Sequence, residues 1–109
     1  MLYKTKDLYE YKLYGEIYKI NIMVVTYDNN NTALIAETAN NEPFAKFSID
    51  IKKKLPKNQI HIDNIENKGI IDYLIKNNLI KEKLVGTTTV NSWEYPIAEL
   101  NMKKFNIDI

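Results

Sequence analysis

The sequence predicts an α+β fold, in which a four- to five-stranded antiparallel sheet, built as a meander, carries one helix packed on one face. Three observations lead to this prediction: short runs rich in β-branched and aromatic residues, Asn-rich turns between them, and one stretch with helical apolar spacing. The 109 residues suit a single domain, 1–109, with one core.

The N-terminal third contains a predicted edge strand and a predicted central strand. Tyr9, Tyr11 and Leu13 share one parity, which indicates an edge strand within residues 2–14, although a short helix fits the same residues. The run EIYKINIMVVTY at 16–27 is rich in β-branched and aromatic residues. Both of its faces are partly apolar, so we expect it to lie inside the sheet. One face comprises Tyr18, Ile20, Ile22 and Val24.

Asn-rich turns separate the next strands. DNNN at 28–31 and NNEP at 40–43 are predicted turns, because Asn tolerates the left-handed backbone conformation that tight turns need. TALIAET lies between them, and FAKFSIDI at 44–51 follows with clean alternation. We expect Ala45, Phe47, Ile49 and Ile51 to face inward and Lys46, Ser48 and Asp50 to face outward. Three such strands in succession form an antiparallel meander.

The second half contains the predicted helix. QIHID at 59–63 predicts a short strand, and Asn64 is a plausible helix N-cap. The helical stripe comprises Ile70, Ile71, Leu74 and Ile75. Asn77 and Asn78 can end the helix in the left-handed conformation. VGTTTVNSWEYPIAEL at 85–100 predicts one or two closing strands, with Pro96 at an edge or a bend.

Composition excludes several classes of function. The formal net charge is +1, whereas a dedicated DNA binder is usually strongly basic and a DNA mimic strongly acidic. The chain has no cysteine, which removes disulfides, thiolate catalysis and Cys-type zinc sites. All fifteen basic residues are lysine, so bidentate Arg contacts to phosphate are missing. No apolar run reaches the roughly 20 residues of a membrane span, and we expect a cytoplasmic protein with no membrane contact.

No catalytic or metal-binding motif emerges. His61 is the only histidine, and its strand parity predicts that it faces solvent, where it could act as a general base with Asp63. Asp50, Asp63 and Glu66 could converge on a cation, but no ligand-dense loop contains them. Ser48 and Ser92 lie outside known nucleophile motifs. We therefore expect no catalytic residue, no metal and no cofactor, and we predict that the protein is not an enzyme.

Two sets of residues are candidates for binding. Lys52, Lys53, Lys54 and Lys57 form the one local charge run, which could contact a nucleic-acid backbone or could simply be a solvated loop. Eight tyrosines and one tryptophan are available for protein contacts, although part of them must form the core. The candidate protein-binding residues are Tyr9, Tyr11, Trp93 and Tyr95.

Five segments carry a resemblance to a known family: TYDNNNTALIAE, NEPFAKFSIDI, IHIDNIEN, YLIKNNLI and SWEYPIAEL. Over residues 23–100 their order and spacing resemble a small uncharacterised family carried by bacterial mobile elements and phages. That family shows a Tyr-Asn-Asn turn, a Gly-Glu-Pro-Tyr/Phe turn, an Asp-Asn before a helix and a Tyr-Pro near the end. Here Asn41 replaces the Gly, and residues 85–93 match the Gly-rich stretch loosely. The resemblance implies a mobile-DNA context and no active site.

These observations favour a non-enzymatic protein-binding module. The hypothesis is a phage or mobile-element inhibitor of host defence, of the anti-CRISPR or anti-restriction type, which occludes a nuclease complex by protein contact. The alternative is a nucleic-acid-binding accessory protein that uses the loop at 52–57. An enzyme based on His61 and Asp63 is a third hypothesis. The expected partner is a host protein, and the chain itself is expected to be a monomer or a homodimer.

Overall fold

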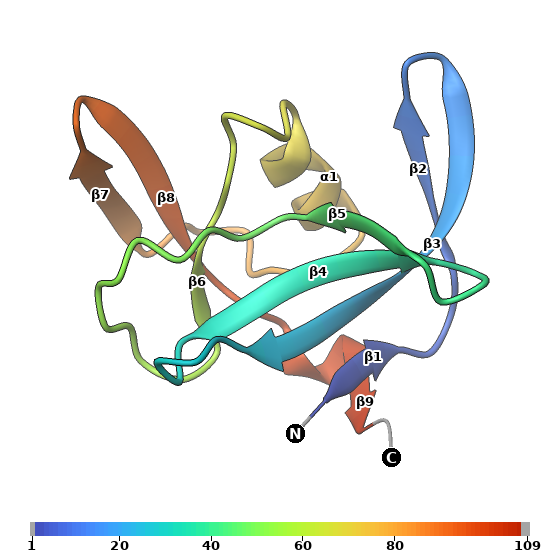
Figure 1. Ribbon diagram of the computed structural model, residues 1–109, viewed down its shortest axis with the longest axis horizontal. Helices are drawn as coiled ribbons and strands as arrows, with labels where there is room; N and C mark the ends of the chain where they lie inside the picture. The colour runs from blue at the N-terminus through green and yellow to red at the C-terminus, as the bar shows by residue number, and fades with distance from the viewer. Residues whose placement is uncertain (1, 108–109) are drawn as a thin grey trace.

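The computed structural model describes residues 2–107, which form nine strands, one α-helix and one 3₁₀ helix in two sheets (Figure 1). The strands are β1 (Tyr3–Thr5), β2 (Tyr9–Leu13), β3 (Glu16–Thr26), β4 (Thr32–Thr38), β5 (Pro43–Lys46), β6 (Gln59–His61), β7 (Gly86–Val90), β8 (Trp93–Glu99) and β9 (Phe105–Ile107). The helices are α1 (Ile70–Lys76) and η1 (Met102–Lys104). The predicted α+β class is confirmed, and all strand pairs are antiparallel.

The larger sheet has the order β5-β4-β3-β1-β9, and β2 also pairs with β3. β1 and β2 share one edge of β3, because Tyr3 lies opposite Val24 whereas Tyr9 lies opposite Ile20. β3 has 11 residues and outruns its other neighbour, since β4 ends at Thr38, opposite Ile20. β2 and residues 16–19 of β3 therefore project beyond the sheet as a hairpin, the first arm.

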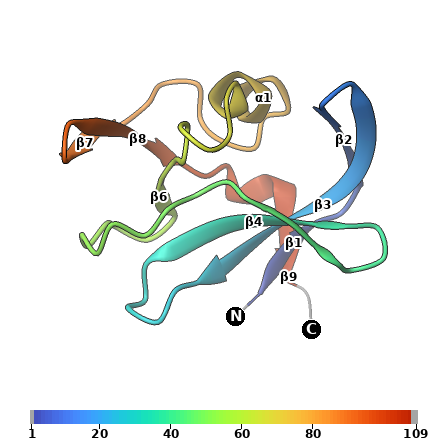
Figure 2. The ribbon, with the colours of Figure 1, turned by 45° about the horizontal axis from the view of Figure 1, so that its top comes forward.

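The smaller sheet has the order β6-β8-β7. β7 and the start of β8 form a second projecting hairpin, the second arm, and α1 lies between the two arms in both views (Figure 1, Figure 2). The two sheets are joined where the chain leaves β5. The Asp63 N–H donates to the Phe47 carbonyl at 2.9 Å, the Ile49 N–H donates to the His61 carbonyl at 3.0 Å, and Ser48 forms a bridge with Ile62.

This junction explains why the predicted number of strands was wrong. A single sheet of four to five strands was expected. Instead, the chain bends after Lys46, and Ser48 pairs with Ile62, which follows β6. The closing strands at 85–100 then extend a second sheet. Ser48 was expected to face outward, and that was wrong too. Its hydroxyl is buried at the bend, where it accepts from the Leu34 N–H at 2.8 Å and contacts the Tyr27 hydroxyl at 2.9 Å.

One core fills the space between the sheets and α1. Phe47, which was predicted to face inward, is buried, whereas Ala45, Ile49 and Ile51 are partly buried. Ile20, Ile22 and Val24 of β3 and Ile70 and Leu74 of the helix are also buried. The rest of the buried cluster comprises Tyr11, Leu34, Ala36, Ile60, Ile62, Leu79, Ile80, Ala98, Leu100 and Phe105. Each fully buried Ile or Leu stabilises the fold by roughly 1.5–3 kcal/mol relative to exposure. Long-range strand pairing therefore brings residues from both ends of the chain into one core.

Four hairpin turns follow two designs. Tyr14–Gly15 and Asn91–Ser92 are two-residue turns in which both residues have positive φ, as type I′ turns require. Residues 28–30 and 39–41 are three-residue loops, each with an Asn in its last position, and Asn30 and Asn41 have φ of 69° and 64°. The predicted Asn-rich turns are confirmed, and they use the left-handed tolerance of Asn.

Helix α1 starts later than expected and ends as expected. Asn64 is not its N-cap, because the helix begins at Ile70 after Gly69, whose φ is 78°. The C-terminus is a Schellman motif: the Leu79 N–H donates to the Leu74 carbonyl at 2.9 Å, and the Asn78 N–H donates to the Ile75 carbonyl at 3.0 Å. Asn78 has φ of 58°, so it provides the left-handed residue.

Candidate functional site

A groove of about 1030 Å³ runs between the first arm, β5 and residues 63–68. Aromatic contacts fix its walls. The Tyr11 ring meets Phe44 of β5 edge-on, with centroids 5.7 Å apart, and meets Tyr73 of α1 edge-on at 4.9 Å. Tyr18 packs against the same Phe44 at 5.1 Å. These pairs connect the base of the arm to both β5 and α1.

The tip of the first arm is apolar and exposed. Tyr14 is 96% exposed and Ile17 is 64% exposed, and Leu13 beside them is also exposed. The type I′ turn at Tyr14–Gly15 holds this tip out from the sheet, and β4 ends too early to cover it. Leu13 and Tyr14 line the groove, whereas Ile17 lies opposite Lys12 and so points to the other face of the arm. Exposed large apolar side chains are typical of protein contact surfaces. We call Leu13, Tyr14 and Ile17 the apolar tip.

The charges around the groove are mixed in sign. The lysines among the lining residues are Lys12, Lys46 and Lys68, and the acids are Glu37, Asp63 and Glu66. Lys4 Nζ lies 2.9 Å from Glu37 Oε1, which partly neutralises that carboxylate. A nucleic-acid backbone needs a surface of one sign. The mixed charges of the groove instead suit a partner protein whose surface has both acidic and basic groups.

The outer edge of β2 contributes free backbone groups to this region. The Tyr73 hydroxyl donates to the Glu10 carbonyl at 2.9 Å, so the N–H and C=O groups of Glu10 point away from β3. In a β-strand the same holds for every second residue. Lys12 has the same parity, and within residues 2–107 its N–H and C=O make no hydrogen bond on that side. The first arm thus combines an apolar tip with a short open strand edge.

The second arm carries the other exposed aromatic residue. Trp93 is 57% exposed and Val85 is 52% exposed, whereas Tyr95 is partly buried. The four candidate aromatic residues therefore fall into two places, since Tyr9 and Tyr11 belong to β2 and Trp93 and Tyr95 belong to β8. The arms lie on opposite sides of α1 (Figure 1), so the four do not form one patch. Tyr11 is 9% exposed and mainly fills the core.

Sequence reasoning missed the apolar tip. Parity placed Leu13 on a predicted edge strand, and Ile17 was assigned to a central strand with both faces covered. The available signal was LYGEI at 13–17, in which apolar residues flank a Tyr-Gly pair that suits a type I′ turn. The sequence pattern did not show where β4 ends. Ile17 is uncovered because β4 stops at Thr38, opposite Ile20.

His61 was expected to face solvent, and that was wrong. It is 3% exposed, and its Nε2 lies 2.9 Å from the Thr88 hydroxyl of β7. Burial lowers the pKa of His61, and the nearby Lys53 ammonium lowers it further, while Asp50 opposes them. Asp63 is turned elsewhere, since its Oδ1 accepts from the Glu66 N–H at 3.1 Å. The two residues do not form an acid–base pair in this structure.

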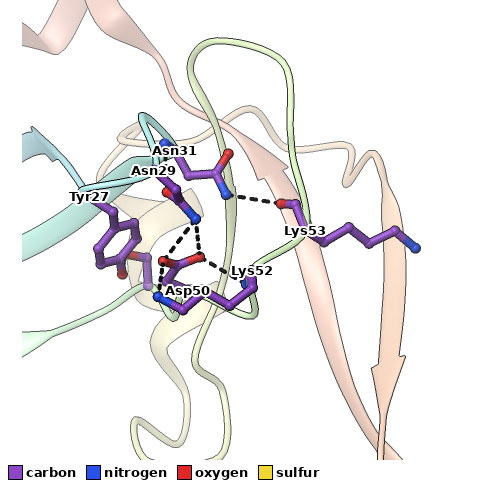
Figure 3. A network of polar contacts seen from close by, with 7 residues as sticks. Tyr27, Asn29, Asn31, Asp50, Lys52 and Lys53 are labelled. Atoms are coloured by element: carbon purple, nitrogen blue, oxygen red, sulfur yellow. Dashed lines mark hydrogen bonds and ion pairs between the residues drawn. The ribbon is translucent and has the colours of Figure 1, made fainter.

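The lysine loop is exposed at its side chains and anchored at its backbone. Asn31 is buried, donates to the Lys53 carbonyl at 3.0 Å and accepts from the Leu55 N–H at 3.2 Å. Asp50 lies 3.3 Å from the Lys52 ammonium and accepts from Asn29 (Figure 3). Burial would raise the pKa of Asp50, but hydrogen bonds from Lys52 and Asn29 outweigh it and lower the pKa. Lys53 extends its ammonium away from this network (Figure 3).

Asp50, Asp63 and Glu66 do not converge on a point. Asp50 belongs to the network with Lys52, whereas the Asp63 carboxylate caps the backbone of Glu66. Among residues 2–107, no group of three or more His, Cys, Asp or Glu side chains is arranged to hold a metal ion.

Helix α1 has seven residues, and no helix in the described part of the chain is long and apolar enough to cross a membrane. Comparison of the chain with protein-family models, with curated proteins and with solved structures finds no match.

Proposed function

We propose that this chain is a non-enzymatic protein-binding module that inhibits a host defence system by occluding a nuclease complex. One observation carries the proposal: Leu13, Tyr14 and Ile17 are exposed at the end of the first arm, and Leu13 and Tyr14 also line the groove between that arm and β5. A rigid hairpin that presents Tyr and Ile at its end can insert into a partner's pocket with little loss of conformational entropy. The groove beside the hairpin would contact the partner's surface around that pocket.

The charge pattern supports a protein partner. The groove is lined by three lysines and three carboxylates, and the net charge of the chain is +1. Charge complementarity of this kind selects a partner with acidic and basic groups of its own. The open edge at Lys12 adds a place where a partner strand can pair for one or two residues.

The defence context is supported by the sequence rather than by the surface. The turn and strand segments of residues 23–100 resemble a family found on mobile elements and phages, where small single-domain inhibitors of CRISPR and restriction nucleases are common. The proposed partner is therefore a CRISPR or restriction nuclease complex of the host. Occlusion needs only tight binding, which is what an inhibitor without catalytic groups can provide.

The test is co-purification from a low-GC bacterium with intact defence systems. The tagged chain is compared with a double variant, Tyr14→Ser with Ile17→Ser, after nuclease treatment. We expect a stoichiometric nuclease subunit with the wild type and a loss of that subunit with the double variant. A matched control changes Trp93→Ser on the other arm and should retain the partner. Recovery of no defence protein by the wild type contradicts the proposal.

A second candidate function is nucleic-acid binding by the lysine loop. The specific observation is that Lys53, Lys54 and Lys57 are exposed on a loop whose backbone Asn31 anchors. Binding would weaken with salt, because each neutralised phosphate releases a counterion. Replacing Lys52, Lys53, Lys54 and Lys57 by Ala should flatten the salt dependence of affinity for a labelled duplex or single strand. An unchanged salt slope would reject this function.

A further inference from the structure

The outer edge of β7 is a strand edge without protection. β7 pairs with β8 on one side, and within residues 2–107 no strand or side chain hydrogen-bonds to its other side. Residues 85–93, VGTTTVNSW, contain no charged residue and no proline. Thr87 and Thr89 are exposed. A flat, uncharged edge rich in β-branched residues favours pairing with another strand.

The free edge of β5 is guarded, and that of β2 is guarded in part. β5 begins with Pro43, which has no N–H to offer, and its Lys46 carbonyl accepts from the Asn67 amide at 2.8 Å. β2 contains Lys12 at its outer edge, and Tyr73 occupies the Glu10 carbonyl. Charges, Pro and covering side chains are the usual devices that prevent edge pairing. Residues 86–90 of β7 contain no charge and no Pro, so this edge lacks both devices.

The hydrogen-bonding parity of β7 identifies the groups that are free. Val90 closes the two-residue turn opposite Trp93, so residues of its parity direct their backbone toward β8. Thr87 and Thr89 have the other parity, and their N–H and C=O groups point away from β8. The free edge therefore presents two donors and two acceptors, placed symmetrically on either side of Thr88.

We propose that this edge binds β7 of a second copy of the chain, antiparallel, about a two-fold axis at Thr88. In that register Thr87 of each copy lies opposite Thr89 of the other, and the pairs exchange four backbone hydrogen bonds. Thr88 faces its own counterpart across the axis. Threonine pairs across strands are favourable, and no charge lies on the seam to oppose a like charge.

The same register brings the exposed Trp93 side chain of one copy near Gly86 of the other. Val90 lies opposite Gly86 of the second copy, and Trp93 lies next to Val90 on the same face. Gly86 has nothing within 4 Å of the position that a Cβ would take, so its bare backbone leaves open space. Val90 and the Trp93 ring can cover this space from across the seam. The glycine and the exposed tryptophan thus become complementary features of one interface.

The dimer would be reversible, because one pair of five-residue strands buries little area. It would not compete with the proposed partner site, since the first arm lies across α1 from the second arm (Figure 2). The two smaller sheets would then form one continuous six-stranded sheet, and each copy would keep its own first arm on its larger sheet. This inference concerns a different surface and stands whether or not the proposed function is correct.

The test is sedimentation equilibrium over a range of concentrations with the full chain. We expect the wild type to pass from monomer to dimer as concentration rises. The double variant Thr87→Lys with Thr89→Lys places ammonium groups opposite each other at two pairs and should weaken the dimer about tenfold or more. Both side chains are exposed, so the variant should retain the circular dichroism spectrum and melting temperature of the wild type.

A charge-swap partner distinguishes this interface from any other. The second double variant is Thr87→Glu with Thr89→Glu, which should also be monomeric alone. Mixing the two variants should restore association as a heterodimer, because each Lys then faces a Glu. A wild type that stays monomeric at all concentrations would overturn the proposal and leave the edge to a strand of a different protein. A dimer that both variants leave unchanged would overturn it equally.

Discussion

The Tyr73 hydroxyl donates a 2.9 Å hydrogen bond to the Glu10 carbonyl and so joins α1 to the first arm. The two residues are 63 positions apart in sequence, and the bond adds to the edge-on contact between Tyr73 and Tyr11. An isolated two-stranded hairpin is marginal in water. The orientation of the apolar tip therefore depends on contacts at the base of the arm, of which this hydrogen bond is one.

The first prediction concerns the removal of this bond. Tyr73→Phe keeps the ring contacts and should lower the free energy of unfolding by about 0.5–1.5 kcal/mol, as measured by urea unfolding at pH 7. Hydrogen exchange at the amides of β2 should increase more than exchange at β4, because only the arm loses an anchor. Tyr14→Phe at the exposed tip is the control and should change neither value. Uniform changes across both strands would contradict the anchoring role.

The second prediction concerns alkaline pH. Burial, followed by the nearby Tyr11 and Tyr9, raises the pKa of Tyr73 to about 12. The unfolded chain loses that proton near pH 10, whereas the folded chain keeps it, so stability falls as pH rises from about 10 to 12. Tyr73→Phe should reduce this slope in thermal melts. Some slope should remain, since burial also raises the pKa of Tyr9 and Tyr11. An identical slope in the variant would show that Tyr73 ionises as freely as in the unfolded chain.

The third prediction concerns mildly acidic pH. Burial lowers the pKa of His61, so below about pH 6.5 the unfolded chain binds a proton that the folded chain does not. Stability should therefore fall as pH drops through that range, by at most about 1.4 kcal/mol per pH unit, and should be flat above it. His61→Gln places an amide near Thr88 without a titrating group and should remove this slope. Asp50 has a lowered pKa, so its own loss of stability begins only below about pH 4.

Residue periodicity predicted the central strand well, and the reason lies in burial. Ile20, Ile22 and Val24 are buried on one face of β3, and a one-residue shift would move all three to the other face. The Asn turns were equally readable, because few residues other than Gly adopt positive φ at low cost. These features are local, so a short window of sequence contains the information that determines them.

The rest of the fold depends on contacts between distant segments. His61 has the parity of a solvent-facing residue on an isolated strand, but it is buried in the fold and contacts Thr88, which lies 27 positions later. Ser48 is polar and alternates correctly, yet the bend between the sheets buries its hydroxyl. The apolar tip depends in turn on where β4 stops. No pattern within one strand encodes the length or position of its neighbour.

The fourth prediction concerns the left-handed turn residues. Asn41 ends a three-residue loop with φ of 64°, where a Gly has no Cβ to clash. Asn41→Gly should raise the free energy of unfolding by up to about 1 kcal/mol, and Asn41→Ala should lower it by about 1 kcal/mol. Asn40 precedes it in the same loop without a positive φ, so Asn40→Gly is the matched control and should destabilise slightly. Urea unfolding checks all three. A stabilising Asn40→Gly would mean that loop flexibility, rather than φ, determines the result.

The fifth prediction concerns the anchor of the lysine loop. Asn31 is 7% exposed and pairs with the Lys53 carbonyl and the Leu55 N–H. Asn31→Ala leaves both backbone groups without their partner and should cost about 1–3 kcal/mol. Asn31→Asp keeps the oxygen that accepts from the Leu55 N–H but places a second oxygen against the Lys53 carbonyl. This variant should therefore also lower the free energy of unfolding, and the loop should loosen first near Lys53. Hydrogen exchange at Leu55 separates the two variants: it should increase strongly in Asn31→Ala and much less in Asn31→Asp. Equal exchange in both would show that the loop is held by contacts other than this side chain.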